Sequence, residues 1–573
     1  MPIRGARFNT VRADAVIPGR TRGTTQSAEN RIMTNRRFIV PVLIAMAVVV
    51  GLGAAAGKAL VEDRNDDRQS VLARLQTFSS VLSMVRDYYV EEVDSEGLVD
   101  AAIRGLLLEL DPHSAYLDEE RFADITERHQ GEYHGIGIHF DILDGWLTVI
   151  SPIEGGPSYE LGLRPGDRIV AIDGVSARNI TTTEVYEKLR GPKGTKVNVS
   201  VRREGFEEDM EFEIIRDKIP IYSVPYSFMV APGVGYVRLI RFSASTSEEL
   251  EDALTELEAQ GMEKLILDLR DNSGGYLTQA VEVTDKFISG KKLVVYTKGR
   301  IANSSQEYYS TEEATHPRIP LIVMISHGSA SASEIVSGAV QDWDRGLVAG
   351  ETSFGKGLVQ RPFKMRDGSG LLLTVARYYT PSGRLIQREY DSDRRDYYTE
   401  GYTGTADDDT TRPVFYTSMG RTVYGGGGIT PDAELEYTRL EPSEQNLARA
   451  RIPFEFATMF ASREGLTKER WSSFDAFMEE FQVTQEILDD CAAFMREKEF
   501  EFTEEDLETG EDYLKMAVKA EIAGHLWSTV ERYRVFISGD DAVRQVVGLF
   551  PEAELLAGQI PPEDAFDKTG TDR

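Results

Sequence analysis

Apolar and polar residues alternate along the chain in patterns that separate helical from strand-rich stretches. Between residues 70 and 128 the apolar residues recur at helical spacing, interrupted by the turn-prone VDSEG, which predicts a small helical module. Pro112 blocks the continuation of a helix, so we expect a loop or capping role for His113 in preference to a ligand role. Residues 131–217 change to short β-type runs with one helix near 183–190, which predicts one compact β-rich domain.

Strands and helices alternate in the next stretch of the chain. The runs VGYVRLIRF, KLILDLRDN, PLIVMIS and GLVAGE read as strands, and helical patterns fall between them at residues 247–260, 276–288 and 333–342. This alternation predicts an α/β core with largely parallel strands. Residues 391–428 are polar and rich in Tyr and Gly, which indicates a long surface excursion.

The chain of 573 residues is several times the size of a usual domain, so we expect several folded units and a multidomain α/β fold class. Acidic helical sequence resumes near Glu441 and carries no recognisable catalytic constellation. The expected segments are a basic N-terminal segment (1–37), an apolar segment (38–57), a helical region (58–130), a β-rich domain (131–218), an α/β core (219–440) and an acidic helical extension (441–573).

Residues 38–57 contain twenty residues without a charge, about what a helix needs to cross ~30 Å of hydrocarbon. Eight Arg, one Asp and one Glu precede this run and acidic residues follow it, which predicts a cytoplasmic N-terminus. We therefore expect a single-pass protein of the bacterial inner membrane with its body on the periplasmic side. Ala54-Ala55-Ala56 also fits a cleavage site, so a removed signal peptide and a secreted periplasmic protein stay open. The compact basic start at Met33 suggests that the first 32 residues are an overlong start.

Charge and cysteine content exclude several classes of partner. The formal net charge is −31, and because residues 1–37 carry +6, the remainder carries −37. Such a body repels nucleic acid and anionic lipid, so no nucleic-acid partner is expected. Cys491 is the only cysteine, which excludes an internal disulfide and a thiolate metal site.

A candidate nucleophile lies where the strand PLIVMIS runs into the small-residue turn of HGSASASEIVSGA. Such a turn exposes a serine at a helix N-terminus, where unpaired backbone N–H groups stabilise a developing oxyanion. The alternative is a Ser-rich helix cap without catalytic function. Four serines compete for the nucleophile role: Ser326, Ser329, Ser331 and Ser333.

A candidate general base follows 25 residues after Ser331, in GETSFGKGLVQ. An extended segment places Lys356 and Gln360 on the same face. Lowering the pKa of a lysine from ~10.4 to ~7 by burial costs roughly 4.6 kcal/mol, which a tightly packed pocket walled by glycine can impose. Gln360 is neutral and therefore suits the task of orienting the amine without restoring its charge.

Two other site classes match less well. Gly350, Gly355 and Lys356 fit the start of a phosphate loop, but Gly357 replaces the Ser or Thr that would hold Mg²⁺. A Ser-His-Asp site would have to use His327, which is too close in sequence to Ser331 to reach it easily. The turn also lacks the G-x-S-x-G elbow, since an alanine replaces the last Gly.

Taken together, several motifs resemble those of the C-terminal processing (tail-specific, S41) peptidases over roughly residues 75–435. They are GSASASEI, FGKG, YYTPSGRLIQ and GGGGITPD. The resemblance implies a crotonase/ClpP-like serine protease core at 219–440, with an inserted PDZ domain at 131–218. It also implies Ser331 as nucleophile, Lys356 as general base and Gln360 as the residue that orients the lysine.

The same resemblance assigns an oxyanion hole. In that family one donor comes from a DLRxNxGG turn, here DLRDNSGG at residues 268–275, and the other from the backbone N–H of Ala332. Gly274 and Gly275 are both candidates for the first donor. A structural role is also open, with an ion pair between Asp268 and Arg270 and the glycines forming a strand-to-helix turn.

The PDZ resemblance assigns a peptide-binding site. Its carboxylate-binding loop would be Gly135, Ile136, Gly137 and Ile138, whose successive N–H groups form an anion nest beside which an extended peptide adds as a strand. Arg168 falls in the region through which PDZ domains of the family contact the protease core, which implies a gating role. An ordinary surface arginine is the alternative.

We therefore expect a serine endopeptidase that recognises the apolar C-terminal tails of exported proteins, for processing or degradation, without a metal or organic cofactor. A catalytically silent PDZ scaffold is one alternative. A ligand-binding module like the related domains of retinoid-binding proteins is another, although such a module is expected to lack Ser331 or Lys356. The extension at 441–573 implies homo-oligomer assembly or docking of an adaptor protein.

Overall fold

The computed structural model describes residues 70–390, 397–398, 412–437 and 439–558. The apolar segment 38–57 and its expected membrane crossing lie outside these residues. Within the described ranges, no helix combines the length and the apolar character that a bilayer crossing requires. The chain divides into two compact units, residues 1–102 and 103–573.

The start of the described chain is helical, as expected. Residues 70–88 form one helix, and α2 (Ser95–Leu108) follows it. Most apolar side chains of the first helix, among them Leu72, Phe78 and Met84, are exposed to solvent.

The β-rich domain is an antiparallel sheet in the order β3-β4-β5-β7-β8, with β6 beside β5. Apolar and polar residues alternate along β7 (Lys196–Arg202), so that Val197, Val199 and Val201 face the core while Asn198 is exposed. The other elements are α3 (Glu119–Gln130), β2 (Glu132–Gly135), β3 (Ile138–Leu143), β4 (Trp146–Pro152), α4 (Pro157–Glu160), β5 (Arg168–Ile172), β6 (Val175–Ser176), α5 (Thr182–Leu189), β8 (Met210–Ile215) and β9 (Asp217–Pro220). Strand β2 precedes this sheet in the chain and β9 follows it, and the two strands pair as an antiparallel ribbon.

The central sheet has the order β10-β11-β12-β15-β16-β21. Only β10 is antiparallel to its neighbour, so the expectation of an α/β core with largely parallel strands is confirmed. Its elements are β10 (Tyr226–Ala231), β11 (Val234–Arg238), α6 (Thr246–Ala259), β12 (Lys264–Asp268), α7 (Leu277–Asp285), β15 (Leu321–Ile325), α8 (Ala332–Asp342), β16 (Leu347–Gly350) and β21 (Ala433–Glu434).

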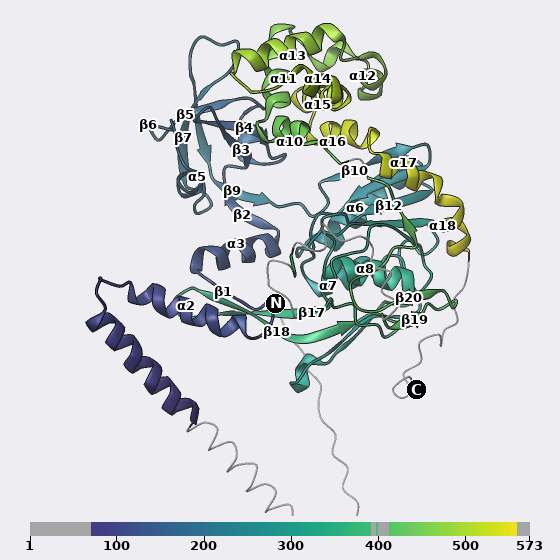
Figure 1. The fold of residues 1–573 in the computed structure, drawn as a ribbon. Coiled ribbons are helices and arrows are strands. Elements are labelled where there is room, and N and C mark those ends of the chain that lie inside the picture. The colour runs from purple at the N-terminus through teal and green to yellow at the C-terminus, as the bar shows by residue number, and fades with distance from the viewer. Residues whose placement is uncertain (1–69, 391–396, 399–411, 438, 559–573) are drawn as a thin grey trace, which may run out of the picture. The chain divides into compact units, whose positions relative to one another are not determined.

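The four inner strands of this sheet, β11, β12, β15 and β16, are buried on both faces. In β12, Leu265 and Leu267 pack into the core formed with α6, α7 and α8, whereas Ile266 packs into a second core on the opposite face. The helices α16 (Thr529–Ser538), α17 (Asp541–Gly548) and α18 (Phe550–Ala557) supply the partners of that second core. Figure 1 shows α17 and α18 against one side of the sheet and α7 and α8 on the other. Helices α16, α17 and α18 therefore form a layer that covers one face of the central sheet.

A second sheet supports the central one. Strand β18 (Gly370–Tyr379) pairs with β1, β13 and β17, and β14 pairs with β13. The bounds of these strands and of the separate β19–β20 hairpin are β1 (Ala115–Leu117), β13 (Leu293–Lys298), β14 (Glu307–Tyr309), β17 (Leu358–Lys364), β19 (Val414–Tyr416) and β20 (Thr422–Tyr424). Strand β17 contains Gln360 and begins two residues after Lys356.

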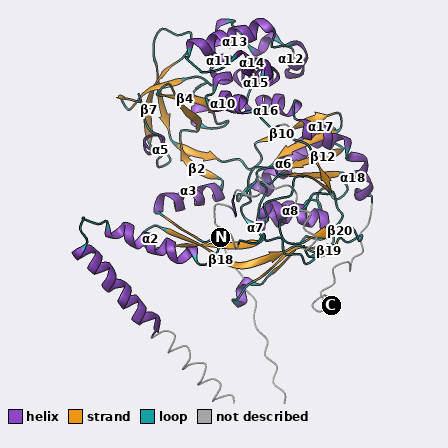
Figure 2. Cartoon of the chain, in the orientation of Figure 1, coloured by secondary structure: helices purple, strands orange, loops and turns teal. Residues whose placement is uncertain are grey.

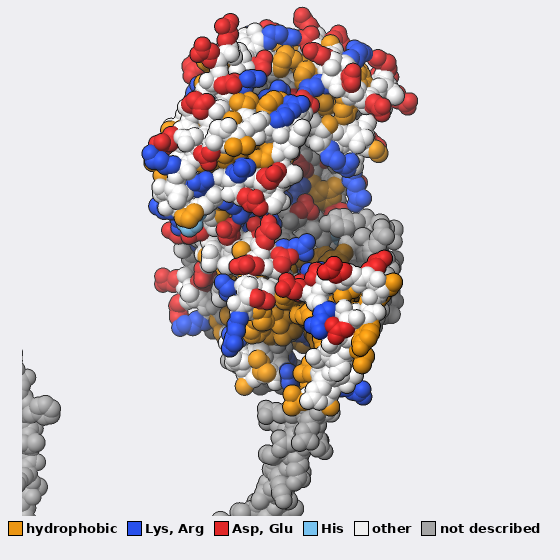
Figure 3. Space-filling view, turned by 90° about the vertical axis from the view of Figure 1, so that its left-hand side faces the viewer, with side chains coloured by type: hydrophobic (Ala, Val, Ile, Leu, Met, Phe, Trp, Pro, Cys, Tyr) orange, Lys and Arg blue, Asp and Glu red, His pale blue; other side chains and the backbone are white. Residues whose placement is uncertain are grey.

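The remaining C-terminal helices form a core of their own, seen as the all-helical part of Figure 2. They are α10 (Pro442–Arg449), α11 (Ile452–Arg463), α12 (Phe474–Glu480), α13 (Gln485–Glu497), α14 (Glu504–Thr509) and α15 (Glu511–Leu526). Ion pairs join this core to the β-rich domain, from Lys498 to Asp144 and from Arg451 to Asp141. On the face shown in Figure 3, acidic and basic side chains are interspersed and no basic patch is visible.

Candidate active site

Ser331 occupies a strained turn between β15 and α8. Its backbone has φ 56° and ψ −112°, a region that residues other than glycine rarely adopt. Two hydrogen bonds hold the turn: the Ser331 N–H donates to Glu334 Oε2 at 2.7 Å, and the Tyr378 hydroxyl donates to the Ser331 carbonyl at 3.0 Å. Strain that the surroundings impose in this way is common at functional sites.

The competing serines have structural roles. The hydroxyl of Ser326 donates to Asp271 Oδ1, that of Ser329 to the Leu269 carbonyl and that of Ser333 to the Asn272 carbonyl, at 2.7–3.0 Å. All three are buried, whereas Ser331 is partly accessible. Accessibility therefore favours Ser331 among the four.

A buried carboxylate joins the serine turn to the lysine loop. Glu334 is fully buried, and its Oε1 accepts from Ser353 Oγ at 2.6 Å and from the Gly355 N–H at 2.7 Å. Its Oε2 accepts from the backbone N–H groups of Ser331 at 2.7 Å and Lys356 at 2.9 Å. Burial raises the pKa of Glu334, and the four donors oppose this shift by stabilising the ionised form. The segments that carry Ser331 and Lys356 are thus tied to one carboxylate.

The amine of Lys356 lies in an environment that disfavours its charge. Burial lowers the pKa of Lys356, and the charges of Glu334 and Asp111 only partly oppose this effect. Its Nζ hydrogen-bonds to Gln360 Oε1 at 2.6 Å, a neutral acceptor. A lysine with a lowered pKa next to a neutral acceptor has the properties that a general base needs.

Gln360 is fixed by a residue from a distant part of the chain. Its Nε2 donates to the carbonyl of His113, so its Oε1 faces Lys356. The imidazole Nε2 of His113 in turn contacts the Tyr397 hydroxyl at 2.9 Å. The loop role expected for His113 agrees with this arrangement, and the loop completes the environment of the lysine.

Two of the predicted oxyanion residues, Gly274 and Ala332, lie beside Ser331. A Cβ placed on Gly274 would lie 2.8 Å from Ser331 Cβ and 2.9 Å from the Ala332 nitrogen, so only glycine fits there. The Gly274 N–H donates to Asn272 Oδ1 at 2.9 Å. Gly275 follows at φ 151°, with its backbone against the Phe242 carbonyl. Ala332 is the first residue of α8, where N–H groups have no partner within the helix.

Asp268 does not take part in this cluster. It is fully buried and forms ion pairs with Arg238 at 2.6 Å and Arg270 at 2.7 Å, and these hold the pKa of its carboxyl below the ordinary range despite burial. His327 lies in a neighbouring pocket with Glu351, which Ser331 does not line. The geometry therefore disfavours a Ser-His-Asp arrangement.

The predicted peptide-binding loop lines a small pocket of the β-rich domain. Ile136, Gly137 and Ile138 face α5 across this pocket, and Gly135 lies at its edge, where an added Cβ would approach the Tyr133 ring. Arg168 is not among the lining residues. Its guanidinium lies 3.8 Å from Glu455 on α11, so it faces the C-terminal helices.

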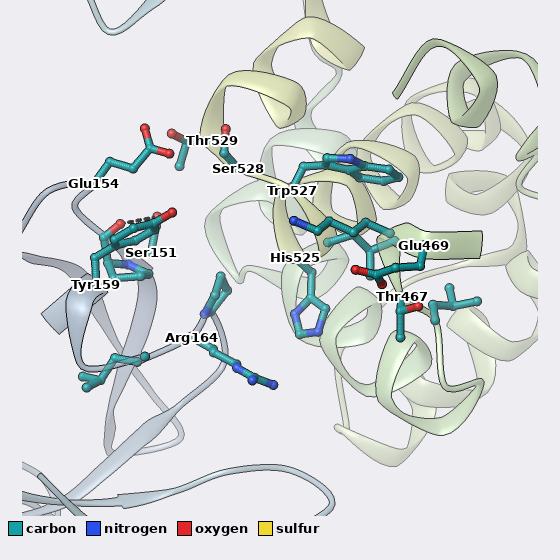
Figure 4. Close-up of a pocket in the computed structure, with 18 residues that line it drawn as sticks. Ser151, Glu154, Tyr159, Arg164, Thr467, Glu469, His525, Trp527, Ser528 and Thr529 are labelled. Atoms are coloured by element: carbon teal, nitrogen blue, oxygen red, sulfur yellow. Dashed lines mark hydrogen bonds between the residues drawn. The ribbon is translucent and has the colours of Figure 1, made fainter. Parts of the chain in front are cut away.

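A wider cleft separates the same domain from the C-terminal helices. It encloses about 600 Å³ and lies away from Ser331. In Figure 4, Arg164 reaches from one wall toward the ring of His525 on the other. Both cationic and anionic side chains line it, so its composition favours no single class of ligand.

Three contributors to the active site were not anticipated from sequence: Glu334, the His113 carbonyl and Tyr378. Glu334 follows Ser331 by three residues, the spacing of a capping box, and this spacing was the available signal. The other two act through contacts with residues far away in the chain, which no local pattern reports.

Comparisons with known proteins identify families that match parts of this chain. Residues 233–393 match peptidase family S41 and residues 148–203 match the PDZ domain. Residues 46–121 match the N-terminal domain of the activating protease CtpB, and residues 445–528 match a family of unknown function. The multidomain α/β fold with a PDZ domain and helical terminal regions is thereby confirmed.

The curated proteins that are similar to this chain include several named carboxy-terminal processing proteases. A carboxy-terminal-processing protease of Bartonella bacilliformis is 38% identical over 56% of this chain and 74% of its own length. The carboxy-terminal processing protease CtpA of Bacillus subtilis is 34% identical over 55% of this chain and 67% of its own. Among solved structures, a photosystem II D1 C-terminal processing protease is 28% identical over 63% of this chain and 86% of its own, with a TM-score of 0.33.

The change Glu334→Gln tests the role of the buried carboxylate. One acceptor oxygen of residue 334 becomes an NH₂ donor, so two of the four hydrogen bonds are lost. The turn that carries Ser331 and the loop that carries Lys356 are then no longer held together by one carboxylate. Hydrogen bonds to charged groups contribute about 1.5–3 kcal/mol each, so the loss of two is expected to slow the modification of Ser331 by a sulfonyl fluoride at least about a hundredfold. Mass spectrometry of the intact protein measures this rate.

The matched control is Ser353→Ala, which keeps the carboxylate and three of its four donors. A smaller loss of rate is expected in this variant. Equal rates in Glu334→Gln and the parent chain would show that the carboxylate does not position Ser331.

Proposed function

Because this chain belongs to the carboxy-terminal-processing proteases of peptidase family S41, we propose that it is a serine endopeptidase in which Ser331 and Lys356 form the catalytic pair. The observation that carries this proposal is the shared carboxylate of Glu334, which binds the backbone of both residues. The lowered pKa of Lys356 and the accessibility of Ser331 support it further.

In the proposed mechanism, neutral Lys356 removes the proton of the Ser331 hydroxyl as Oγ attacks the scissile carbonyl. The negative charge on the carbonyl oxygen is stabilised by the N–H of Ala332 together with that of Gly275, because the Gly274 N–H already donates to Asn272 Oδ1. Protonated Lys356 then gives its proton to the leaving amine, and an acyl-enzyme remains on Ser331. Water, deprotonated by the same lysine, releases the new C-terminus. Gln360 orients the amine throughout, and no step needs a metal or organic cofactor.

The PDZ domain binds peptides, and we propose that it selects substrates by their C-terminal tail. An apolar last residue would enter the pocket beside Gly135, Ile136, Gly137 and Ile138, with the free carboxylate at their N–H groups. Arg168 faces Glu455 on α11, so its ion pair among the described residues is with the C-terminal helices and does not support a gating role toward the protease core.

Cleavage of an unstructured protein with an apolar C-terminus tests the proposal. Ser331→Ala abolishes cleavage, and Lys356→Ala lowers the rate at least about a hundredfold, because general-base catalysis contributes about 10²–10⁴. Amidation of the substrate's C-terminus slows cleavage by the parent chain, because the carboxylate is lost.

Full activity in Lys356→Ala would contradict the assignment of the base. Equal cleavage of the free and amidated substrates would contradict tail selection while leaving the catalytic pair intact. If the parent chain cleaves neither substrate, the catalytically silent scaffold becomes the better interpretation.

We also propose that the body of the protein acts outside the cytoplasm, at the bacterial inner membrane or free in the periplasm. The apolar run at residues 38–57 and the positive charge before it support this localisation. An alkaline phosphatase fused after residue 69 is expected to be active, since that enzyme folds only in an oxidising compartment. An inactive but stable fusion would contradict the localisation.

A further inference from the structure

Arg190 closes one end of the PDZ pocket. It follows α5 directly, and its guanidinium lies over the rings of Tyr186 and Tyr133, 4.5 and 4.9 Å from their centroids. The same pocket is lined by Ile136, Gly137 and Ile138. A fixed cation therefore stands beside the loop to which a peptide carboxylate is expected to bind.

The hydrogen bonds of this guanidinium are incomplete. Its Nη1 donates to Glu127 Oε2 at 2.8 Å and lies 3.5 Å from Asp124 Oδ1, both on α3. Its Nε is buried and has no acceptor among the residues that the structure describes. A buried donor without a partner is costly, so this edge of the guanidinium is suited to an acceptor that arrives with a ligand.

The backbone of the loop is oriented for the same kind of ligand. The carbonyl of Ile136 accepts from Ser158 N and Oγ at 3.1 and 2.6 Å, and the carbonyl of Gly137 accepts from the Ile153 N–H at 2.9 Å. In a trans peptide the N–H points opposite to the carbonyl, so the N–H groups of Gly137 and Ile138 point away from these partners. Adjacent N–H groups held in this way form an anion-binding concavity.

From these contacts we infer that Arg190 is the cationic half of the site that binds the C-terminal carboxylate of a substrate tail. In the unliganded chain the carboxylates of Asp124 and Glu127 bind this cation in place of the ligand. A tail carboxylate at the loop accepts from the free Nε of Arg190 and competes with the two α3 carboxylates. The inference rests on the proposed function insofar as the tail belongs to a substrate.

The relative strengths of these contacts favour the ligand. Arg190, Asp124 and Glu127 each keep about a third of their side-chain surface exposed, 32%, 38% and 35%, and exposed ion pairs contribute little. Asp124 also binds Arg128 at 2.9 Å, so its carboxylate is shared. A carboxylate that fills the pocket meets both the loop N–H groups and a guanidinium already ordered by two aromatic rings.

Tail binding is measured on the full chain carrying Ser331→Ala, so that no cleavage occurs and the result does not depend on the catalytic mechanism. The probe is a fluorescent peptide ending in Ala-Ala-Val with a free carboxylate, alongside the same peptide amidated, and fluorescence anisotropy gives the affinity. Arg190→Gln is expected to weaken binding of the free-carboxylate peptide about tenfold, the loss of one charge-assisted hydrogen bond, and to leave the weak binding of the amide unchanged. Arg202→Gln is the matched control, because Arg202 pairs with Asp209 in the same domain and does not line the pocket, and it should leave both affinities unchanged.

The second variant removes the internal competitors without touching the pocket. Asp124→Asn with Glu127→Gln is expected to tighten binding of the free-carboxylate peptide about two- to fivefold, the contribution of an exposed ion pair. A gain in affinity cannot result from misfolding, so this variant guards against a folding defect in Arg190→Gln. Parent-like affinity in Arg190→Gln, or weaker binding in the double variant, would overturn the inference, whereas loss of cleavage alone bears only on the proposed function.

Discussion

Four hydrogen bonds to one buried carboxylate hold the active site together. Glu334 is fully buried, so the fold must supply donors to its carboxylate, and they come from the serine turn and from the loop at 353–356. Satisfying this group requires the two segments to meet. The strained backbone of Ser331 and the position of Lys356 both follow from that requirement.

The supports of this arrangement come from distant parts of the chain. The carbonyl of His113 fixes Gln360, and Tyr378 on β18 fixes the carbonyl of Ser331. On the far side of the central sheet, α16, α17 and α18 cover residues such as Ile266 and Met324, whose burial keeps the parallel strands in register. The catalytic geometry therefore depends on residues from both ends of the described chain.

The features that the sequence predicted correctly are those that depend on local residue patterns. Alternation of strands and helices predicted the parallel core, and the motifs around Ser331 and Lys356 predicted residues that the structure brings to one carboxylate. The sequence did not predict that helices α16, α17 and α18 cover one face of the central sheet. An amphipathic pattern indicates that a helix has a buried side, but it does not indicate which element that side packs against. The role of Arg190 was not predicted for a similar reason, because its guanidinium is held by Glu127, which lies 63 residues earlier in the chain.

The most direct test of the central claim is the pH dependence of Ser331 acylation by an activated ester in a single turnover. Burial lowers the pKa of Lys356 from its ordinary value of 10.5, so the neutral base is present above the lowered pKa and is lost as the pH falls through it. The acylation rate is therefore expected to rise with a midpoint below 10.5 and to collapse at every pH in Lys356→Arg, whose side chain stays charged. A midpoint at the ordinary lysine value, or an unchanged profile in Lys356→Arg, would contradict the account.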